Sequence, residues 1–353
     1  MATLTTPIPS GTHCRFNPRA LTRQLPRPTA LSRPTGLDLG WRTDFSEQYK
    51  QGAIIGRGSY GVVHQGTHRS SGTETAIKTL SKVRHGWTRA KALSKIERET
   101  AILKALQPLT AVVRLLECFE EPDGDNVHLV IELCRGGDLN AYTEECGTLD
   151  EVSLARVAYE VLSTVKGFHD AGYVHGDVKP GNFVLADPTC FIAASMPAGG
   201  LKAIDVGCTQ AVVPVAGKGS VRLTRRAGSP MFMAPEVFAG SFSFKADVWA
   251  AGVMLYWLFS GDYPVASAVS DLRSAKVNDI SHAVKTFDAV FDSGVWQGLS
   301  CDGRDFIARC LDRVEATRLD VDAALAHPWI QRVGVPRRSK QATRCTEQLL
   351  TCV

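Results

Sequence analysis

Short runs rich in apolar residues, bounded by turn residues, predict strands joined by turns within the first 134 residues of the chain. Residues 62–64 and 74–80 read as two strands, and Ser70-Ser71-Gly72 between them predicts the turn of a hairpin. Residues 130–134 read as a further strand that leads into a Gly-containing loop. This part of the chain is therefore expected to form paired strands.

Two other segments are expected to be helical. Ile96, Leu103 and Leu106 recur at helical spacing and predict a helix over residues 91–106. Residues 248–260 form the richest apolar stretch, but a membrane-spanning helix needs about 18 or more apolar residues. We therefore interpret this stretch as a buried helix and expect no transmembrane segment.

The composition is that of an ordinary globular protein, and the net charge comes from one end of the chain. Of 353 residues, 44% are hydrophobic and 22% are charged, as in typical soluble domains. The formal net charge is +4, yet residues 1–37 contain five Arg and no acidic residue, while the rest carries 35 basic and 36 acidic residues. The body of the chain has no general attraction for nucleic acid, so we expect no nucleic-acid partner.

The N-terminal leader, residues 1–45, has a composition of its own. Its first 37 residues hold six Pro and nine Ser or Thr besides the Arg residues, which is more typical of a plastid transit peptide than of a mitochondrial one. A disordered basic extension of a cytoplasmic protein is the alternative, because Pro and Ser also predict disorder. At the other end, residues 332–353 are expected to form a loose tail.

The ten cysteines are scattered and include no C-x-x-C pair. Their spacing indicates neither a zinc site nor a thioredoxin-like motif, so free thiols are the default interpretation. A redox role for Cys208, Cys345 or Cys352 is a secondary hypothesis.

The strongest chemical signal is in residues 175–182, which read His-Gly-Asp-Val-Lys-Pro-Gly-Asn. Gly and Pro argue against a helix here, and the segment gathers a carboxylate (Asp177), an ammonium (Lys179) and an amide (Asn182). Phosphoryl transfer needs these three groups together. The carboxylate orients the attacking hydroxyl, the cation neutralises the phosphoryl group, and the amide oxygen helps to hold a metal.

A Gly-rich segment, Gly56-Arg-Gly58-Ser-Tyr-Gly61-Val-Val63, fits the pattern G-x-G-x-x-G-x-V. In a dinucleotide-binding turn such glycines open a helix, whereas here the chain continues as a strand. Glycines between two strands favour a flap whose backbone N–H groups contact phosphates. A Gly-rich hairpin without a ligand is the alternative for this segment taken alone.

Charged residues on the neighbouring elements complete a candidate phosphate and metal site. Lys78 lies on a predicted strand, and Thr75-Ala-Ile-Lys78 resembles the V-A-I-K pattern of protein kinases. That resemblance implies a Glu on the predicted helix as the partner of Lys78, namely Glu99, with Glu97 as the competitor. Residues 201–204 read as a strand that delivers Asp205 to a Gly turn. A carboxylate in such a turn suits Mg²⁺, which prefers oxygen ligands.

These motifs resemble, in order and spacing, those of eukaryotic protein kinases over residues 49–331. The segment Gly228-Ser-Pro-Met-Phe-Met-Ala-Pro-Glu236 resembles the one that closes the activation loop. Asp247 matches the buried Asp of the following helix, and Arg318 fits the Arg that pairs with the Glu. The resemblance implies an α+β, two-lobed protein kinase fold, with a small antiparallel β-sheet lobe that carries one helix and a larger, mainly α-helical lobe.

The resemblance also implies a set of site residues, with ATP and Mg²⁺ as cofactors. The implied catalytic residues are Asp177, Lys179, Lys78 and Glu99. The implied metal ligands are Asn182 and Asp205. The residues implied to bind the nucleotide are Gly56, Gly58, Gly61, Val63, Ala76, Lys78, Glu132, Cys134, Asp138, Asn182 and Asp205.

The resemblance further implies a substrate class. Lys179, two residues after Asp177, is typical of Ser/Thr kinases, and Ser229 could hydrogen-bond Asp177, so a protein substrate with a Ser or Thr acceptor is expected. Within the family the chain is most similar to plant calcium-dependent and calmodulin-dependent protein kinases. It contains no EF-hand loop, so we expect no direct calcium binding.

Two positions depart from the family pattern. Gly176 replaces the Arg that ordinarily binds a phosphorylated activation loop, and Val206 replaces the Phe that follows the metal-binding Asp. We therefore hypothesise that activity does not depend on phosphorylation of Thr224 or Ser220, and that the smaller Val206 could lower activity. The alternative function is a pseudokinase-type nucleotide-binding scaffold, although all six catalytic identities are retained.

Overall fold

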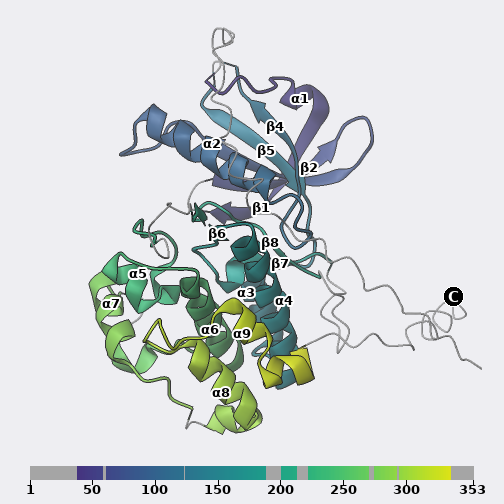
Figure 1. Cartoon of the computed structure of the whole chain (residues 1–353). Coiled ribbons are helices and arrows are strands. Elements are labelled where there is room, and N and C mark those ends of the chain that lie inside the picture. The colour runs from purple at the N-terminus through teal and green to yellow at the C-terminus, as the bar shows by residue number, and fades with distance from the viewer. Residues whose placement is uncertain are drawn as a thin grey trace, which may run out of the picture. The chain divides into compact units, whose positions relative to one another are not determined.

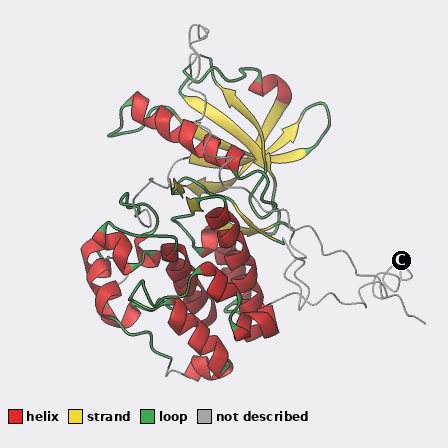
Figure 2. Cartoon of the chain, in the orientation of Figure 1, coloured by secondary structure: helices red, strands yellow, loops and turns green. Residues whose placement is uncertain are grey.

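The computed structural model describes residues 38–58, 61–122, 124–187, 200–212, 222–269, 274–291 and 294–334. All of these described residues belong to one compact unit. Within the described part, a strand-rich lobe is followed along the chain by a helix-rich lobe (Figures 1 and 2). The predicted two-lobed α+β fold is confirmed.

The smaller lobe is a five-stranded antiparallel sheet with the strand order β1-β2-β3-β5-β4. Its strands are β1 (Tyr49–Gly58), β2 (Gly61–His68), β3 (Glu74–Ser81), β4 (Leu115–Glu120) and β5 (Asn126–Glu132). The segment 130–134, predicted as a strand that runs into a loop, is the end of β5, and Leu133 and Cys134 follow it.

Both faces of this sheet are covered, since neighbouring residues of a strand point to opposite faces. Leu129 joins the main core with Ile96 of α2 (Arg89–Ala105), whereas Val130 joins a second cluster against α1 (Phe45–Gln48). Helix α2 starts two residues before the predicted helix and ends one residue earlier. It lies against the sheet in Figure 1.

The segment before the sheet corrects one expected boundary. We expected residues 1–45 to be a disordered leader, but the backbone N–H groups of Asp38, Leu39 and Gly40 donate to the Glu120 carboxylate at 2.8, 3.0 and 3.0 Å. The completely buried Lys82 also contacts Glu120, at 3.1 Å. A buried carboxylate that needs donors therefore fixes residues 38–40 on the sheet, while residues 1–37 lie outside the described part.

The larger lobe is built around helix α6, which is buried along almost its whole length. Helices α4 and α8 pack against it. The described helices of this lobe are α3 (Leu139–Cys146), α4 (Glu151–Asp170), α5 (Pro235–Ala239), α6 (Lys245–Ser260), α7 (Val277–Thr286), α8 (Cys301–Cys310) and α9 (Val321–Leu325). Among the described helices, none has both the length and the apolar character required to cross a membrane.

Two short antiparallel ribbons lie next to the loop of predicted catalytic residues. They are β6 (Tyr173–Val174) with β9 (Gln210–Ala211), and β7 (Phe183–Leu185) with β8 (Leu201–Ala203). The loop that carries the predicted catalytic residues runs from β6 to β7. The expected C-terminal tail begins in a π-helical turn, Ile330–Gly334, and its remainder, residues 335–353, is outside the described part.

Candidate active site

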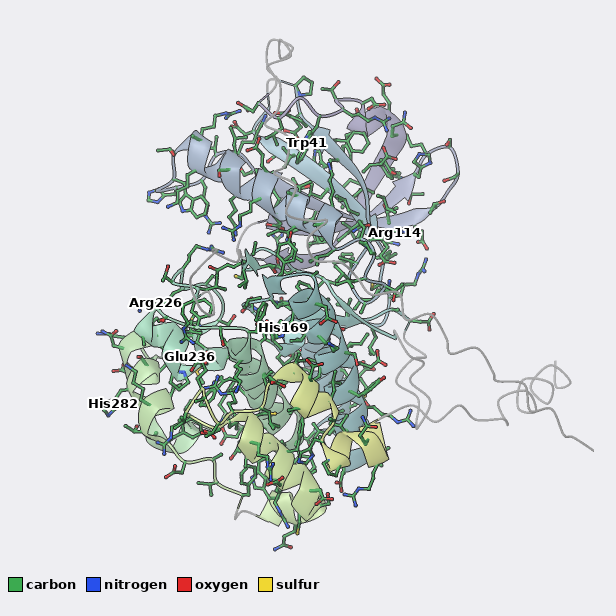
Figure 3. The ribbon with its side chains drawn as sticks, in the orientation of Figure 1. Trp41, Arg114, His169, Arg226, Glu236 and His282 are labelled. Atoms are coloured by element: carbon green, nitrogen blue, oxygen red, sulfur yellow. The ribbon has the colours of Figure 1, made fainter. Side chains whose placement is uncertain are left out.

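One buried carboxylate fixes the start of the loop between β6 and β7. Asp247, in the first turn of α6, accepts the backbone N–H groups of His175 at 2.8 Å and Gly176 at 2.9 Å. His169 Nε2 on α4 lies 2.9 Å from the same carboxylate (Figure 3). Burial alone would raise the pKa of Asp247, but these neighbours outweigh it and hold that pKa below its ordinary value. The carboxylate therefore stays charged and the loop backbone stays fixed.

Gly176 occupies a position that suits glycine. Its φ is +76°, and a Cβ placed on it would lie 2.9 Å from the carbonyl oxygen of Cys208. Any other residue would have to adopt the left-handed conformation and displace this carbonyl. The departure from the family Arg therefore removes strain from the backbone next to Asp177.

The other two predicted residues of this loop, Lys179 and Asn182, both contact the Asp177 carboxylate. Lys179 Nζ lies 2.9 Å from Asp177 Oδ2, and Asn182 Nδ2 donates to the same oxygen at 3.0 Å. The backbone N–H of Ser229 donates to Oδ1 at 2.8 Å. The predicted contact between Ser229 and Asp177 is thus made by the backbone, while the Ser229 hydroxyl accepts a hydrogen bond from Lys179 at 2.8 Å.

A second cluster joins the two lobes. Lys78 Nζ on β3 lies 2.6 Å from Glu99 Oε1 on α2 and 3.4 Å from Asp205 Oδ1. Glu99 is buried, whereas the competing candidate Glu97 is exposed. Burial opposes the charge on Lys78, but the two carboxylates outweigh it and raise the pKa of the ammonium group. Lys78 is therefore a fixed cation.

The ribbon β7–β8 brings the two clusters together. Phe183 pairs with Ala203, so Asn182 and Ile204 meet just beyond the ribbon, where the Ile204 N–H donates to the Asn182 carbonyl at 3.1 Å. Asp205 is the next residue, and its Oδ1 accepts the Gly207 N–H at 2.9 Å. Antiparallel register thus places both predicted metal ligands at one end of one ribbon.

These two residues fit a hard cation. The amide nitrogen of Asn182 donates to Asp177, which leaves the amide oxygen as an available acceptor. Burial would raise the pKa of Asp205, but Lys78 and the Gly207 N–H outweigh it and lower that pKa. One amide oxygen and one ionised carboxylate are donors that Mg²⁺ prefers.

The Gly-rich segment forms the end of the β1–β2 hairpin. Gly58 pairs with Gly61, and residues 59–60 between them lie outside the described part. A Cβ on Gly61 would lie 2.1 Å from the carbonyl oxygen of Thr79, so only glycine fits this close approach to β3. Gly56 pairs with Val63 across the same hairpin. The predicted pairing of two strands around these glycines is confirmed, and the chain continues as a strand after Gly61 instead of opening a helix.

The residues expected around the adenine share one face of the sheet. Val63 is the cross-strand partner of Lys78, and Ala76 is the partner of Ile131. Directly opposed residues of antiparallel strands point to the same face, as do residues two apart on one strand. This face therefore presents Lys78 beside small and branched apolar side chains.

The side chains at and after the end of β5 have their own contacts, while the expected nucleotide-binding role of Glu132 and Cys134 stays a prediction. The Glu132 carboxylate lies 2.7 Å from Lys202 Nζ of β8 and accepts the N–H of Arg114 at 2.8 Å. Burial raises the pKa of the Cys134 thiol to about 11, so it is uncharged near neutral pH. Asp138 Oδ1 caps α3 by accepting two backbone N–H groups, each at 2.9 Å, so this oxygen is already engaged.

The segment that closes the activation loop is anchored by a buried ion pair. Arg318 Nη2 donates to Glu236 Oε2 at 3.0 Å, and the Arg318 side chain is completely buried against Trp249. Glu236 is labelled at α5 in Figure 3. The expected pairing of Glu236 with Arg318 is present, and it fixes the segment that carries Ser229.

Sequence reasoning missed two lysines near the site. Lys202 bridges β8 to Glu132, and Lys95 of α2 donates to the Gly207 carbonyl at 3.0 Å. Each occupies an ordinary polar position of a strand or helix, for which the sequence assigned no role. Only the pairing of distant segments reveals them.

Comparison with known proteins agrees with this geometry. The family described as protein kinase domain matches residues 49–330. The chain belongs to the protein kinase family. This kinase-family chain is 34% identical over 291 residues to Serine/threonine-protein kinase PEPKR2 of Arabidopsis thaliana, a match that covers 82% of the chain and 55% of the relative.

Two further relatives are plant kinases of the group expected from the sequence. CDPK-related kinase 5 of Arabidopsis thaliana is 33% identical over 302 residues, which is 84% of this kinase-family chain and 46% of that protein. Calcium-dependent protein kinase 22 of Oryza sativa subsp. japonica is 33% identical over 304 residues, 83% of the chain and 48% of that protein. The chain spans about half the length of the curated relatives it matches.

Proposed function

We propose that this chain is a Mg·ATP-dependent protein serine/threonine kinase, which transfers the γ-phosphoryl group of ATP to Ser or Thr hydroxyls of a protein substrate. One observation carries the proposal. The ribbon β7–β8 brings the ion cluster of Lys78, Glu99 and Asp205 next to the hydrogen-bonded cluster around Asp177. The names of the relatives support the same reaction class.

Each residue has a role that follows from its contacts. Asp177 accepts hydrogen bonds from donors that hold its carboxylate in place, so it can accept the O–H of a substrate Ser or Thr and take its proton. Lys179 adds a cation between Asp177 and Ser229, where negative charge develops on the transferring group. Preorganised charge of this kind is usually the largest contribution to catalysis.

Asn182 and Asp205 would hold Mg²⁺ through one amide and one carboxylate oxygen. When bound, the metal neutralises phosphate charge. Lys78 supplies a second, permanent cation for the phosphates, and Glu99 fixes its position. We propose that the Gly-rich hairpin at Gly56–Gly61 covers the phosphates with its backbone N–H groups.

We further propose that activity does not require phosphorylation of the activation loop. Gly176 supplies no cation for a phosphate on the activation loop. Arg222 already forms an ion pair with Glu315 at 2.7 Å and donates a hydrogen bond to the Ser241 hydroxyl at 3.1 Å. Thr224 is exposed, and Ser220 lies outside the described residues. Replacement of Thr224 with Ala is expected to leave phosphate transfer intact, and abolished transfer would contradict this proposal.

Phosphate transfer from labelled ATP to a generic basic protein tests the main proposal. The full chain is assayed with and without Mg²⁺ beside Asp205→Ala and the matched surface control Asp288→Ala, whose side chain is 87% exposed. We expect transfer by wild type and Asp288→Ala, and loss of transfer in Asp205→Ala. ATP binding without transfer by wild type would instead establish a nucleotide-binding scaffold.

The cellular address and calcium response are proposed from composition. We propose that residues 1–37 direct the protein to plastids, and a fluorescent protein fused after residue 45 tests this in plant protoplasts. Fluorescence throughout the cytoplasm would contradict it. That the chain binds no calcium directly remains a prediction, and calorimetric titration of the full chain with Ca²⁺ checks it.

A further inference from the structure

We call residues 222–236 the activation segment, and its first residues pair with the connection between α5 and α6. The Leu223 N–H donates to the Phe242 carbonyl oxygen at 2.8 Å, and the Phe242 N–H donates to the Leu223 carbonyl oxygen at 3.0 Å. These two bonds form a single antiparallel bridge outside the named strands. Because two backbone hydrogen bonds contribute only modestly to stability, further contacts are needed to keep this end of the segment in place.

The Arg222 side chain supplies such contacts to two distant parts of the larger lobe. Its Nη2 lies 2.7 Å from Glu315 Oε2, in the loop between α8 and α9. Its Nε donates to the Ser241 hydroxyl at 3.1 Å, and Nη2 also donates to the Ser241 carbonyl oxygen. A guanidinium group has donors in fixed, diverging directions, which suits a side chain that must reach two segments at once.

The Glu315 carboxylate is itself held in position. The Ser243 hydroxyl donates to its Oε1 at 2.5 Å, so each of its two oxygens has a partner. Burial alone would raise the pKa of Glu315, but Arg222 and the Ser243 hydroxyl outweigh it and lower that pKa. The Glu315 side chain is 18% exposed and that of Arg222 is 37% exposed. The pair is therefore ionised and partly shielded from water, which strengthens it relative to a fully exposed pair.

One loop holds both ends of the activation segment. Glu315 contacts Arg222 at the start of the segment. Three residues later in the same loop, Arg318 pairs with Glu236 at its end, which is labelled in Figure 3. Two ion pairs to residues 312–318 thus fix the segment at two points.

The contact that positions the Asp177 carboxylate lies midway between these two points. Ser229 is seven residues after Arg222 and seven before Glu236, and its N–H donates to Asp177 Oδ1 at 2.8 Å. A chain segment fixed at both ends has fewer conformations available than one fixed at a single end. The pair at Arg222 therefore favours the hydrogen bond at Ser229 without touching it.

We propose that Arg222 and Glu315 are positioning residues, whose ion pair holds the activation segment in the arrangement in which Ser229 supports Asp177. Phosphorylation can order a loop by adding a negative charge that pairs with a cation, whereas here both charges are side chains of the chain itself. The inference rests on the proposed kinase function. It adds the physical reason why that function does not require a phosphate on the segment.

Hydrogen exchange is measured first, because it needs no catalysis. We expect the amides of residues 222–229 to exchange about fivefold faster in Arg222→Ala and in Glu315→Ala than in wild type. The matched control is Arg313→Ala, which removes an arginine of the same loop, 38% exposed, from its 2.7 Å ion pair with Asp288. This control should leave the exchange of residues 222–229 unchanged.

Phosphate transfer is measured next, with kcat and KM determined separately for ATP and for the protein substrate. We expect Arg222→Ala and Glu315→Ala each to lower kcat/KM for the protein substrate about five- to tenfold, with KM for ATP within about twofold of wild type. Arg222→Lys keeps the charge and should retain part of the activity. The double variant should lose no more than the weaker single variant, because the two residues act as one pair.

Three results overturn the proposal. They are unchanged exchange of residues 222–229 in the single variants, losses of kcat/KM that multiply in the double variant, and an equal loss in Arg313→Ala. Faster exchange in the single variants together with no transfer by wild type would retain the pair as an anchor of the activation segment and refute the kinase function instead.

Discussion

Replacement of Gly176 with Ala tests whether the backbone next to Asp177 requires glycine. Two costs apply at this position. A left-handed φ costs a non-glycine residue about 1–2 kcal/mol, of which about 0.4–1 kcal/mol is offset because Ala restricts the unfolded chain. In addition, the new Cβ would lie 2.9 Å from the Cys208 carbonyl, a backbone atom that must move, and such overpacking typically costs about 1–3 kcal/mol.

Gly72→Ala separates the two costs. Gly72, in the turn between β2 and β3, has a φ of +71°, close to the +76° of Gly176, but nothing lies within 4 Å of its Cβ position. This variant should therefore show only the conformational cost, a net loss of about 1 kcal/mol. The extra loss in Gly176→Ala measures the contact with Cys208.

Thermal unfolding of the full chain with both variants is the assay. Unfolding entropy scales with chain length, so for a unit of this size about 1 kcal/mol lowers Tm by roughly 2 °C. We expect Gly72→Ala to lower Tm by about 2 °C and Gly176→Ala by about 4–8 °C. Only Gly176→Ala should also lower kcat, because Asp177 is the next residue. An equal or smaller Tm loss in Gly176→Ala would refute the reasoning.

Three further predictions concern buried charges. Glu99→Gln should lower kcat/KM about 10²-fold, because it frees Lys78, while the exposed Glu97→Gln should not, as steady-state kinetics will show. Arg318→Met should destabilise the fold by about 3–5 kcal/mol because it leaves the largely buried Glu236 carboxylate, which is 10% exposed, without its partner. Denaturant unfolding should show that adding Glu236→Gln restores part of the loss. Burial lowers the pKa of His175 below 6.5, so protonation favours the unfolded chain. Tm should therefore fall as the pH drops below about 6.5. The fall should be shallower in His175→Phe, and an unchanged dependence of Tm on pH in this variant would show that His175 is not the titrating group.

The sequence was sufficient for elements whose signal is local. Glycines between two strands, the helical spacing around Glu99 and the broken loop at Asp177 each depend on neighbouring residues, and the structure contains all three. Because the motifs also occur in a family order, the two-lobed fold could be expected from them.

Contacts between distant segments were harder to predict. The donors of Glu120 are backbone N–H groups of residues 38–40, which no side-chain pattern identifies. The Lys202 contact with Glu132 depends on how the ribbon β7–β8 meets the end of β5. The role of Asp138 as the N-cap of α3 could have been predicted, since Asp is a common N-cap residue. The family resemblance instead suggested that Asp138 contacts a ligand.

The hydrogen bonds from residues 38–40 to Glu120 separate two regions in which a cut near the N-terminus would have different effects on the sheet. If proteolytic processing removes the N-terminal segment, a cut before Asp38 preserves all three N–H donors of the buried carboxylate. A cut after Gly40 would remove those donors, together with the Asp38 carboxylate that lies 3.3 Å from Lys82. Any cut in this region that keeps the buried Glu120 carboxylate supplied with its donors must therefore lie before Asp38.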